Sequence, residues 1–297
     1  MSIHSVVLHF MLAANTNKPV TGNYLSIGKQ SVLINELRIS RLLEIYGYPP
    51  VNMVKIDDKT RKTLFGVQDV DLLRAFSAAN YDCLDKSDYE SANEILDLNS
   101  ANIPDALQQN FDFIYDGGTL DNVFSPAQAI ANLAKMLRVG GRILNFNLGT
   151  GWPGVYCAAS CEWLFSYYAA NQFANVKVFM AIPVVADRKW PDPAFTLFSY
   201  SPYFTRSSTY DPLEAATRAT PIGGFVIGFA ERTASSTVDK IPTQSHYLEA
   251  GEMDWRKKYL EYEQSQHLAL QFDMDRNTEI APCPFESDHY KYLGVLS

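Results

Sequence analysis

One strand–helix–strand unit, residues 111–147, constrains the fold of this chain more than any other stretch. Its first part, Phe111–Tyr115, is apolar and aromatic, as is typical of a buried parallel strand. Asp116-Gly117-Gly118 interrupts that pattern, and glycines at such a point let the backbone approach a ligand closely. Open parallel sheets bind ligands outside the carboxyl ends of their strands. The sequence therefore predicts a ligand site at residues 116–118.

The second part of this unit carries the signals of a helix followed by another strand. Ser125 and Pro126 suit the N-cap and the first position of a helix. Apolar residues recur at helical spacing in the run that ends at Arg138, namely Ile130, Leu133, Ala134 and Leu137. Gly140-Gly141 would stop that helix, and Ile143–Asn147 would form the next strand. These signals predict an α/β fold with a parallel sheet.

Composition excludes several classes of protein. The 297 residues suffice for one large domain or two small ones. A net charge of −8 argues against a nucleic-acid partner, and no apolar run approaches the roughly 20 residues of a membrane span. Val6–Ala14 is short and apolar without a preceding Lys or Arg, which favours an N-terminal docking helix over a signal peptide. The cysteines form neither a disulfide framework nor a paired metal motif, which favours a cytoplasmic location: Cys83, Cys157, Cys161 and Cys283.

The unit at 111–147 resembles the fourth and fifth strands of class I S-adenosylmethionine-dependent methyltransferases. In that family, Phe-Asp and two hydrophobic residues lead into the turn on the cofactor side, as Phe111-Asp112-Phe113-Ile114 does here. A segment similar to Met136–Arg142 then precedes strand five. The resemblance implies a Rossmann-like fold, with a seven-stranded, mostly parallel sheet whose strands six and seven are antiparallel. It also implies S-adenosyl-L-methionine as the cofactor.

The loop after the first predicted strand, Tyr24–Ile27, departs from the family pattern. The family usually has an acidic residue followed by three spaced glycines, whereas this chain has Ser26 in the acidic position and keeps only Gly28. Lys29-Gln30 follows, which is similar to a subgroup from biosynthetic gene clusters with a degenerate glycine-rich loop. That resemblance assigns Gly28, Lys29 and Gln30 to the cofactor. An ordinary strand–helix turn is the alternative.

Two acids end the next predicted strands. Asp85 ends the strand Tyr81–Asp85, and Asp97 lies near the polar end of a second short strand, Glu94–Asn99. A carboxylate suits two vicinal hydroxyls because it accepts two hydrogen bonds at once. The resemblance assigns Asp85 to the ribose and Asp97 to the adenine amine. The predicted cofactor site thus comprises Gly28, Lys29, Gln30, Asp85, Asp97, Leu98, Asn99, Asp116, Gly117 and Gly118. Solvated acids at strand ends are the alternative for the two carboxylates.

The chain is expected to have three parts: an N-terminal helix and linker (1–22), a methyltransferase-like domain (23–233) and a C-terminal appendage (234–297). Val176–Val185 and Phe225–Ala230 fit strands six and seven of the family. Between them, an insertion at 186–223 is rich in aromatic residues, prolines and serines. Long irregular insertions usually have a function. We expect either a lid over an acceptor pocket or a packing arm of a homodimer.

The predicted function is enzymatic methyl transfer from S-adenosylmethionine to a small molecule, with no nucleic-acid, membrane or metal partner. The protein then has to align the reactants and exclude water, and it needs a base only where the acceptor is a hydroxyl. Asp121 and Tyr156 are the predicted catalytic residues, with His246 and His289 as further candidates for a base. Three alternatives stay open: intramolecular cyclisation of the cofactor, aminocarboxypropyl transfer, and a non-catalytic binding protein. The motifs of dinucleotide-dependent oxidoreductases and of serine hydrolases are absent.

Overall fold

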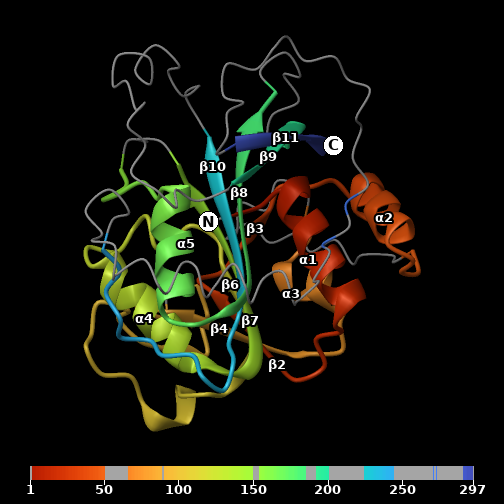
Figure 1. Ribbon diagram of the computed structural model, residues 1–297. Coiled ribbons are helices and arrows are strands. Elements are labelled where there is room, and N and C mark those ends of the chain that lie inside the picture. The colour runs from red at the N-terminus through yellow and green to blue at the C-terminus, as the bar shows by residue number, and fades with distance from the viewer. Residues whose placement is uncertain are drawn as a thin grey trace, which may run out of the picture.

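The computed structural model describes residues 2–50, 66–88, 90–149, 154–184, 192–200 and 224–243, with Leu270, Phe272 and 290–296. These residues form a twisted sheet between two groups of helices (Figure 1). Several predicted features lie outside the described residues: His246, His289 and most of the 186–223 insertion. The division into an N-terminal segment, a central domain and a C-terminal appendage remains a prediction.

The strand order of the main sheet identifies the topology. In the described part of the chain the order is β11-β9-β8-β10-β7-β6-β2-β4-β5. The strands are β2 (Asn23–Ile27), β4 (Asn80–Asp85), β5 (Glu94–Ile95), β6 (Phe111–Asp116), β7 (Leu137–Leu148), β8 (Ala174–Pro183), β9 (Phe195–Tyr200), β10 (Phe225–Glu231) and β11 (Tyr290–Leu296). The first five in the chain are parallel and have the spatial order 3-2-1-4-5 of a doubly wound fold. The Rossmann-like prediction is confirmed.

The end of the sheet formed by β10, β8, β9 and β11 agrees with the predicted antiparallel pairing but has more strands than predicted. Strand β10 lies between β7 and β8 and is antiparallel to both, as expected for strands six and seven. The predicted number of seven strands is wrong, because the described residues form nine. Strand β9, from the predicted insertion, pairs with the free edge of β8, and β11, from the predicted appendage, pairs with β9. In a seven-stranded sheet the outer edge of β8 would have no partner strand, and β9 covers it here.

Helices cover both faces of the sheet (Figure 1). Helices α1 (Ser5–Asn17), α2 (Glu36–Ile45) and α3 (Asp69–Arg74) lie on one face, and α4 (Pro126–Met136) and α5 (Cys161–Ala170) on the other. Side chains of β6 alternate between these layers, so that Phe113 and Tyr115 belong to the first core and Ile114 to the second. A short parallel pair, β1 (Ser2–Ile3) with β3 (Ser31–Val32), and a 3₁₀ turn at Asp105–Leu107 complete the elements.

The helix predicted to reach Arg138 ends earlier, at Met136, and β7 begins at Leu137. The strand pair β6–β7 contains a bulge, since Phe111 pairs with Leu137 while Phe113 pairs with Arg142. Gly140 has a φ of +79° within this bulge. A Cβ atom on Gly141 would lie 2.6 Å from the Phe111 carbonyl oxygen. The two glycines therefore allow a bulged strand here instead of stopping a helix.

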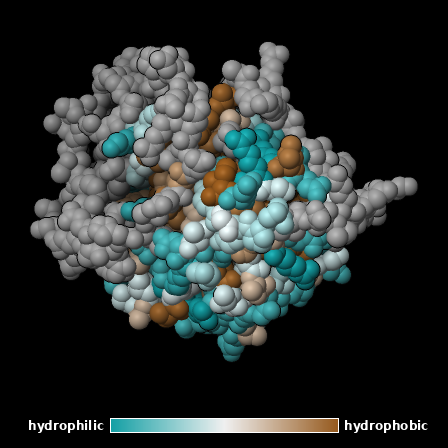
Figure 2. Space-filling view, turned by 90° about the vertical axis from the view of Figure 1, so that its right-hand side faces the viewer, coloured by the Kyte–Doolittle hydropathy of each residue, from teal (hydrophilic) through white to brown (hydrophobic). Residues whose placement is uncertain are grey.

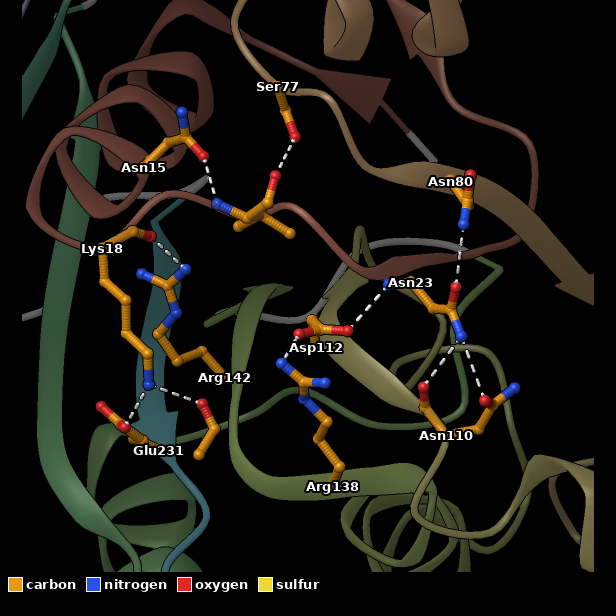
Figure 3. A network of polar contacts seen from close by, with 12 residues as sticks. Asn15, Lys18, Asn23, Ser77, Asn80, Asn110, Asp112, Arg138, Arg142 and Glu231 are labelled. Carbon is orange, nitrogen blue, oxygen red and sulfur yellow. Dashed lines mark hydrogen bonds and ion pairs between the residues drawn. The ribbon is translucent and has the colours of Figure 1, made fainter.

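Polar contacts tie together the amino ends of the strands (Figure 3). Asp112 at the start of β6 forms an ion pair with Arg138 and accepts a hydrogen bond from the Asn23 backbone N–H at 2.8 Å. The buried Arg142 guanidinium donates to the Ala14 carbonyl at 2.8 Å, which fixes the C-terminal end of α1. This edge is held by structural contacts, whereas open α/β sheets bind ligands at the opposite, carboxyl edge.

Among the described residues, no helix is long and apolar enough to cross a bilayer. On the face turned toward the viewer in Figure 2, described residues are mainly hydrophilic or neutral, and the hydrophobic ones form small separate patches. A patch of that size is ordinary on a globular protein.

Candidate functional site

A pocket of about 490 Å³ lies at the carboxyl edge of the parallel strands. Its walls come from the ends of β2 and β4 and from the loops that follow β2, β4, β5, β6 and β7. The lining residues are Ile27, Gly28, Leu84, Asp85, Lys86, Leu96, Asp97, Leu98, Asn99, Thr119, Asn122, Val123, Phe124 and Tyr156. This volume and the mixture of apolar walls with a few polar groups are typical of a small-molecule site.

Asp85 and Asp97 present two carboxylates to this pocket. Asp85 is half-buried, and its Oδ1 accepts a hydrogen bond from the Lys86 backbone N–H at 2.6 Å. Asp97 Oδ1 accepts from the backbone N–H and the side-chain amide of Asn99, at 2.9 and 2.8 Å. The Lys86 ammonium lies 3.0 Å from Asp97 Oδ2. The Asn99 hydrogen bond and the Lys86 ammonium lower the pKa of Asp97 to about 2, so this carboxylate is ionised at neutral pH.

Asn99 and Asn132 hold the Asp97 turn against α4. Asn99 Oδ1 accepts a hydrogen bond from the Ser125 backbone N–H at 2.8 Å. The buried Asn132 amide on α4 donates to the Leu98 and Ser100 carbonyls at 3.0 and 2.8 Å. The turn that carries Asp97 is therefore fixed before any ligand binds.

The loop after β2 is held together by side chains. Gly28 has a φ of +72°, and its N–H donates to the Leu84 carbonyl at 2.7 Å. Ser26 Oγ donates to the Gly28 carbonyl at 2.8 Å. The buried Gln30 amide donates to the Ile27 and Gly28 carbonyls at 2.8 and 3.0 Å. A glutamine thus satisfies backbone groups in the loop where two of the expected glycines are missing.

Asp69, which the sequence did not point to, anchors this loop. Its buried carboxylate accepts from the Gln30 backbone N–H at 2.9 Å and from the Tyr81 hydroxyl at 2.6 Å. The Lys29 ammonium lies 3.4 Å from Asp69 and 5.4 Å from the centre of the Tyr81 ring. Lys29 is therefore directed toward Asp69 and Tyr81, and it does not line the pocket.

The turn after β6 is buried behind the pocket. Asp116 accepts hydrogen bonds from the amides of Asn145 and Asn147, each at 3.1 Å, and from the Thr119 backbone N–H at 2.8 Å. Burial raises the pKa of Asp116 despite these donors. A Cβ atom on Gly117 would lie 2.3 Å from Gln30 Oε1, so a side chain at this position would displace that buried amide. Gly118 has a φ of +98°.

The two predicted catalytic residues occupy different environments. Asp121 is buried, its Oδ2 accepts from the Leu148 backbone N–H at 2.9 Å, and burial raises its pKa to about 7. Tyr156 is 69% exposed at the pocket, where its ring meets the 80% exposed Phe124 edge to face, with centroids 5.6 Å apart. The Tyr156 backbone N–H donates to the Asp121 carbonyl at 2.8 Å. Together with the Cys157 N–H, which donates to the same carbonyl at 3.3 Å, it joins the loops after β6 and β7.

The structure brings some predicted site residues together and leaves others outside the pocket. Those that line it are Gly28, Asp85, Asp97, Leu98, Asn99 and Tyr156. Those that lie behind or beside it are Lys29, Gln30, Asp116, Gly117, Gly118 and Asp121. Sequence reasoning missed Lys86 and Phe124. The position of Lys86 directly after Asp85 was the available signal for the first.

A buried histidine near the same edge was also missed. His4 packs against Phe146, Phe195 and Phe225, with ring centroids 5.8, 5.9 and 6.2 Å away. Its Nδ1 lies 3.9 Å from Asp192 Oδ1, and Asp192 also lies 3.0 Å from the Arg38 guanidinium. These residues come from β7, β9, β10, α2 and the segment before β9, so no local sequence pattern indicates the contacts. Among the described residues, no cluster of three or more His, Cys, Asp or Glu side chains could hold a metal ion.

Comparisons with known proteins find similarity at the level of the fold. No family model and no curated protein matches the chain. Burkholderia thailandensis 1,6-didemethyltoxoflavin-N1-methyltransferase, crystallised with 1,6-didemethyltoxoflavin and S-adenosylhomocysteine, is 11% identical over 77% of this chain and 78% of that chain, with a TM-score of 0.36. The [4+2]-cyclase SpnF is 12% identical over 76% and 80%, also with 0.36. Haemonchus contortus phosphoethanolamine N-methyltransferase 2, in complex with S-adenosyl-L-methionine, is 11% identical over 76% and 52%, with 0.39.

Scores this low carry no weight on their own, and the fold follows from the topology. Five parallel strands in the order 3-2-1-4-5 are followed by a strand inserted antiparallel between the fifth and the sixth. This is the arrangement expected from the resemblance of the 111–147 unit. The chain therefore has a doubly wound α/β fold with an antiparallel strand inserted at one side of the parallel strands, as the resemblance implies.

Proposed function

We propose that this protein is an enzyme that transfers the methyl group of S-adenosyl-L-methionine to a small molecule. The observation that carries the proposal is the position of Asp85 and Asp97, which line one pocket at the carboxyl edge of the sheet. Ligands bind at this edge in open α/β sheets. Two fixed carboxylates between apolar walls suit a nucleoside, which offers vicinal hydroxyls and a base with an exocyclic amine.

The residues of the pocket fit the nucleoside part of this cofactor. Asp85 has one oxygen that accepts only from the adjacent Lys86 N–H, so it has capacity for the two ribose hydroxyls. Asp97 Oδ2 has a lone pair left beside the Lys86 ammonium, and it can accept from the adenine amine. Ile27, Leu84 and Leu96 supply apolar surface for the rings.

The chemistry asks little of the protein beyond alignment. The cofactor supplies a methyl group activated by its sulfonium centre. Phe124 and Tyr156 stand at the pocket with their rings exposed, and they can stack on an acceptor and exclude water from it. Tyr156 also presents a hydroxyl for proton transfer. Asp121 lies behind the turn at Gly118, where the acceptor would have to reach it past that glycine.

Isothermal titration calorimetry tests the proposal. S-adenosylmethionine and S-adenosylhomocysteine should each bind the purified chain with a Kd of about 1 μM or below, equivalent to a free energy of about −8 kcal/mol. If neither ligand binds, methyl transfer and the alternative reactions of S-adenosylmethionine are all ruled out for this protein. Incubation with the cofactor alone then separates the reactions: release of methylthioadenosine without an acceptor would favour cyclisation over methyl transfer.

A further inference from the structure

Two exposed aromatic rings touch each other at the wall of the pocket. Phe124 is 80% exposed and Tyr156 is 69% exposed, and both line the pocket. In the part of the chain that the structure describes, the other exposed large apolar side chains are aliphatic and lie outside the pocket wall: Leu37, Ile45, Ile95, Val139 and Ile241. Single aliphatic side chains on a surface are ordinary, whereas a contiguous aromatic pair at a cavity indicates a binding surface.

The two rings form a right-angled corner, which we call the aromatic corner. The centroids of Phe124 and Tyr156 are 5.6 Å apart, and the ring planes meet at 83°. Aromatic rings attract one another in offset-stacked and in edge-to-face arrangements. A flat ring that stacks on one member of the corner is perpendicular to the other member, so it can form both arrangements at once. A saturated molecule of the same size gains only the burial of apolar area.

Hydrogen bonds hold the backbone on both sides of the aromatic corner. The Tyr156 and Cys157 N–H groups donate to the Asp121 carbonyl at 2.8 and 3.3 Å. The Ser125 N–H, next to the other ring, donates to Asn99 Oδ1 at 2.8 Å. The loops that carry the two rings are therefore fixed at their base, and a molecule that binds between the rings has little backbone to order.

The charged side chains of the pocket come from other loops than the aromatic corner. Asp85 and Lys86 lie at the end of β4, and Asp97 lies in the turn after β5. The Lys86 ammonium is already paired with Asp97, at 3.0 Å. The loops after β6 and β7 supply neutral side chains beside the two rings: Thr119, Asn122 and Val123. A charged group that left water for the corner would therefore find no opposite charge among these lining side chains.

We propose that the methyl acceptor is a neutral, planar aromatic or heteroaromatic molecule that stacks in the aromatic corner. The proposal rests on the proposed function, since it names the class of that enzyme's second substrate. Ile27, Leu84 and Leu96 already supply apolar surface for the nucleoside, so the corner is available to a second molecule.

The transfer itself balances for a ring hydroxyl or a ring N–H. A lone pair of that oxygen or nitrogen forms the new bond to the methyl carbon. The carbon–sulfur bond breaks with its electron pair left on sulfur, and the proton of the hydroxyl or N–H passes to water. The exposure of both rings gives water access to this part of the pocket.

Pairs of flat and saturated probes test this assignment. Phenol and cyclohexanol share a ring skeleton and a hydroxyl and differ in planarity, as do 2-naphthol and decahydro-2-naphthol. Ligand-observed NMR titrations on the full chain, with S-adenosylhomocysteine in excess, should show that each flat probe binds about fivefold or more tightly than its saturated partner. The anion 2-naphthoate has the same flat rings and should bind about tenfold more weakly than 2-naphthol.

Variants at the corner separate ring stacking from other contacts. Tyr156→Leu and Phe124→Leu should each lower the preference for the flat probe to about twofold or less. Tyr156→Phe keeps the ring and should retain the full preference. Val139→Ala is the matched control, because Val139 is an exposed apolar residue near the amino end of β7 and outside the pocket wall. It should leave the preference unchanged.

Three results would overturn the assignment while S-adenosylhomocysteine still binds. One is an unmodified protein that prefers the flat probe in neither pair. Another is a preference that both leucine variants keep. The third is binding of 2-naphthoate as tight as that of 2-naphthol, which would contradict a neutral acceptor. The proposed function would survive each of these results. If the unmodified protein did not bind S-adenosylhomocysteine, the proposed function would fail, and this assignment would fail with it.

Discussion

Gln30 and Gly117 lie so close together that a Cβ atom on residue 117 would be 2.3 Å from Gln30 Oε1 and 2.9 Å from its Cδ. Gln30 follows β2 and Gly117 follows β6, which are neighbouring parallel strands. The side chain of Gln30 therefore occupies space at the carboxyl edge and also holds the loop carbonyls of Ile27 and Gly28. One amide thus contacts both the loop after β2 and the turn after β6.

This contact predicts that Gly117→Ala is destabilising. Because the neighbouring atoms belong to a buried and hydrogen-bonded amide, the free energy of unfolding should fall by about 1–3 kcal/mol. Urea denaturation monitored by circular dichroism measures it. In a Gln30→Ala background the same substitution should cost clearly less, because the clash is gone. An equal cost in both backgrounds would contradict the contact.

Asp69 should stabilise the loop after β2, although it lies about 40 residues further along the chain. Asp69→Asn weakens hydrogen bonds to Gln30 and Tyr81 and removes the charge next to Lys29. We expect a loss of about 1.5–3 kcal/mol in stability. Asp71→Asn on the same helix is the control, since its partner Arg74 is exposed and 3.7 Å away, and it should cost less than about 1 kcal/mol. Equal effects in thermal denaturation would show that Asp69 is no anchor.

The buried Asp121 carboxyl predicts a specific pH dependence of stability. Its pKa is about 7 in the folded protein and near 3.9 in an unfolded chain, so the folded state holds the proton more tightly. Between about pH 4 and 7 the unfolded state binds fewer protons, and stability falls as the pH rises. Asp116 and Cys157 face Asp121, and burial raises the pKa of each of them as well.

Comparison with a neutral variant isolates the contribution of Asp121. The difference in free energy of unfolding between Asp121→Asn and the unmodified protein should move in favour of the variant from pH 5 to pH 7.5. Urea titrations at a series of pH values measure this difference. A constant difference across that range would mean that Asp121 titrates normally.

Phe124 should contribute to ligand binding but little to stability. It is 80% exposed, so Phe124→Ala should change the free energy of unfolding by no more than about 0.5 kcal/mol. Because its ring lines the pocket, the same variant should weaken binding of S-adenosylhomocysteine. Leu37→Ala removes an equally exposed apolar side chain from α2 and should affect neither property. If calorimetry showed that both variants bind S-adenosylhomocysteine as tightly as the unmodified protein, Phe124 would not be part of the ligand site.

The sequence predicted the parts of the site that depend on where strands end. Parallel strands end at the same edge of a sheet, so the acid that ends β4 and the acid that follows β5 could be placed together with Gly28. Asp85 and Asp97 do line one pocket. Gly140–Gly141 predicts the end of a helix from sequence but forms a bulge in the structure, because glycine is common in both situations.

Other features depend on contacts that no local pattern records. The sequence of Val70–Ala78 looks helical, but it does not show that Asp69, at the start of α3, faces the loop after β2. The ring of His4 contacts the rings of Phe195 and Phe225, which are both far away in the sequence. The pairing of β9 with β11 also joins distant segments, which is why a seven-stranded sheet was expected.

Titration of S-adenosylhomocysteine into the unmodified protein and into Asp97→Ala tests the central claim most directly. Asp97→Ala removes a fixed, ionised acceptor from the pocket and should weaken binding by about tenfold to a hundredfold. Asp88→Ala, an exposed acid in the loop after β4, is the control and should bind as the unmodified protein does. Binding to the unmodified protein that Asp97→Ala leaves unchanged would contradict a cofactor site at this edge of the sheet.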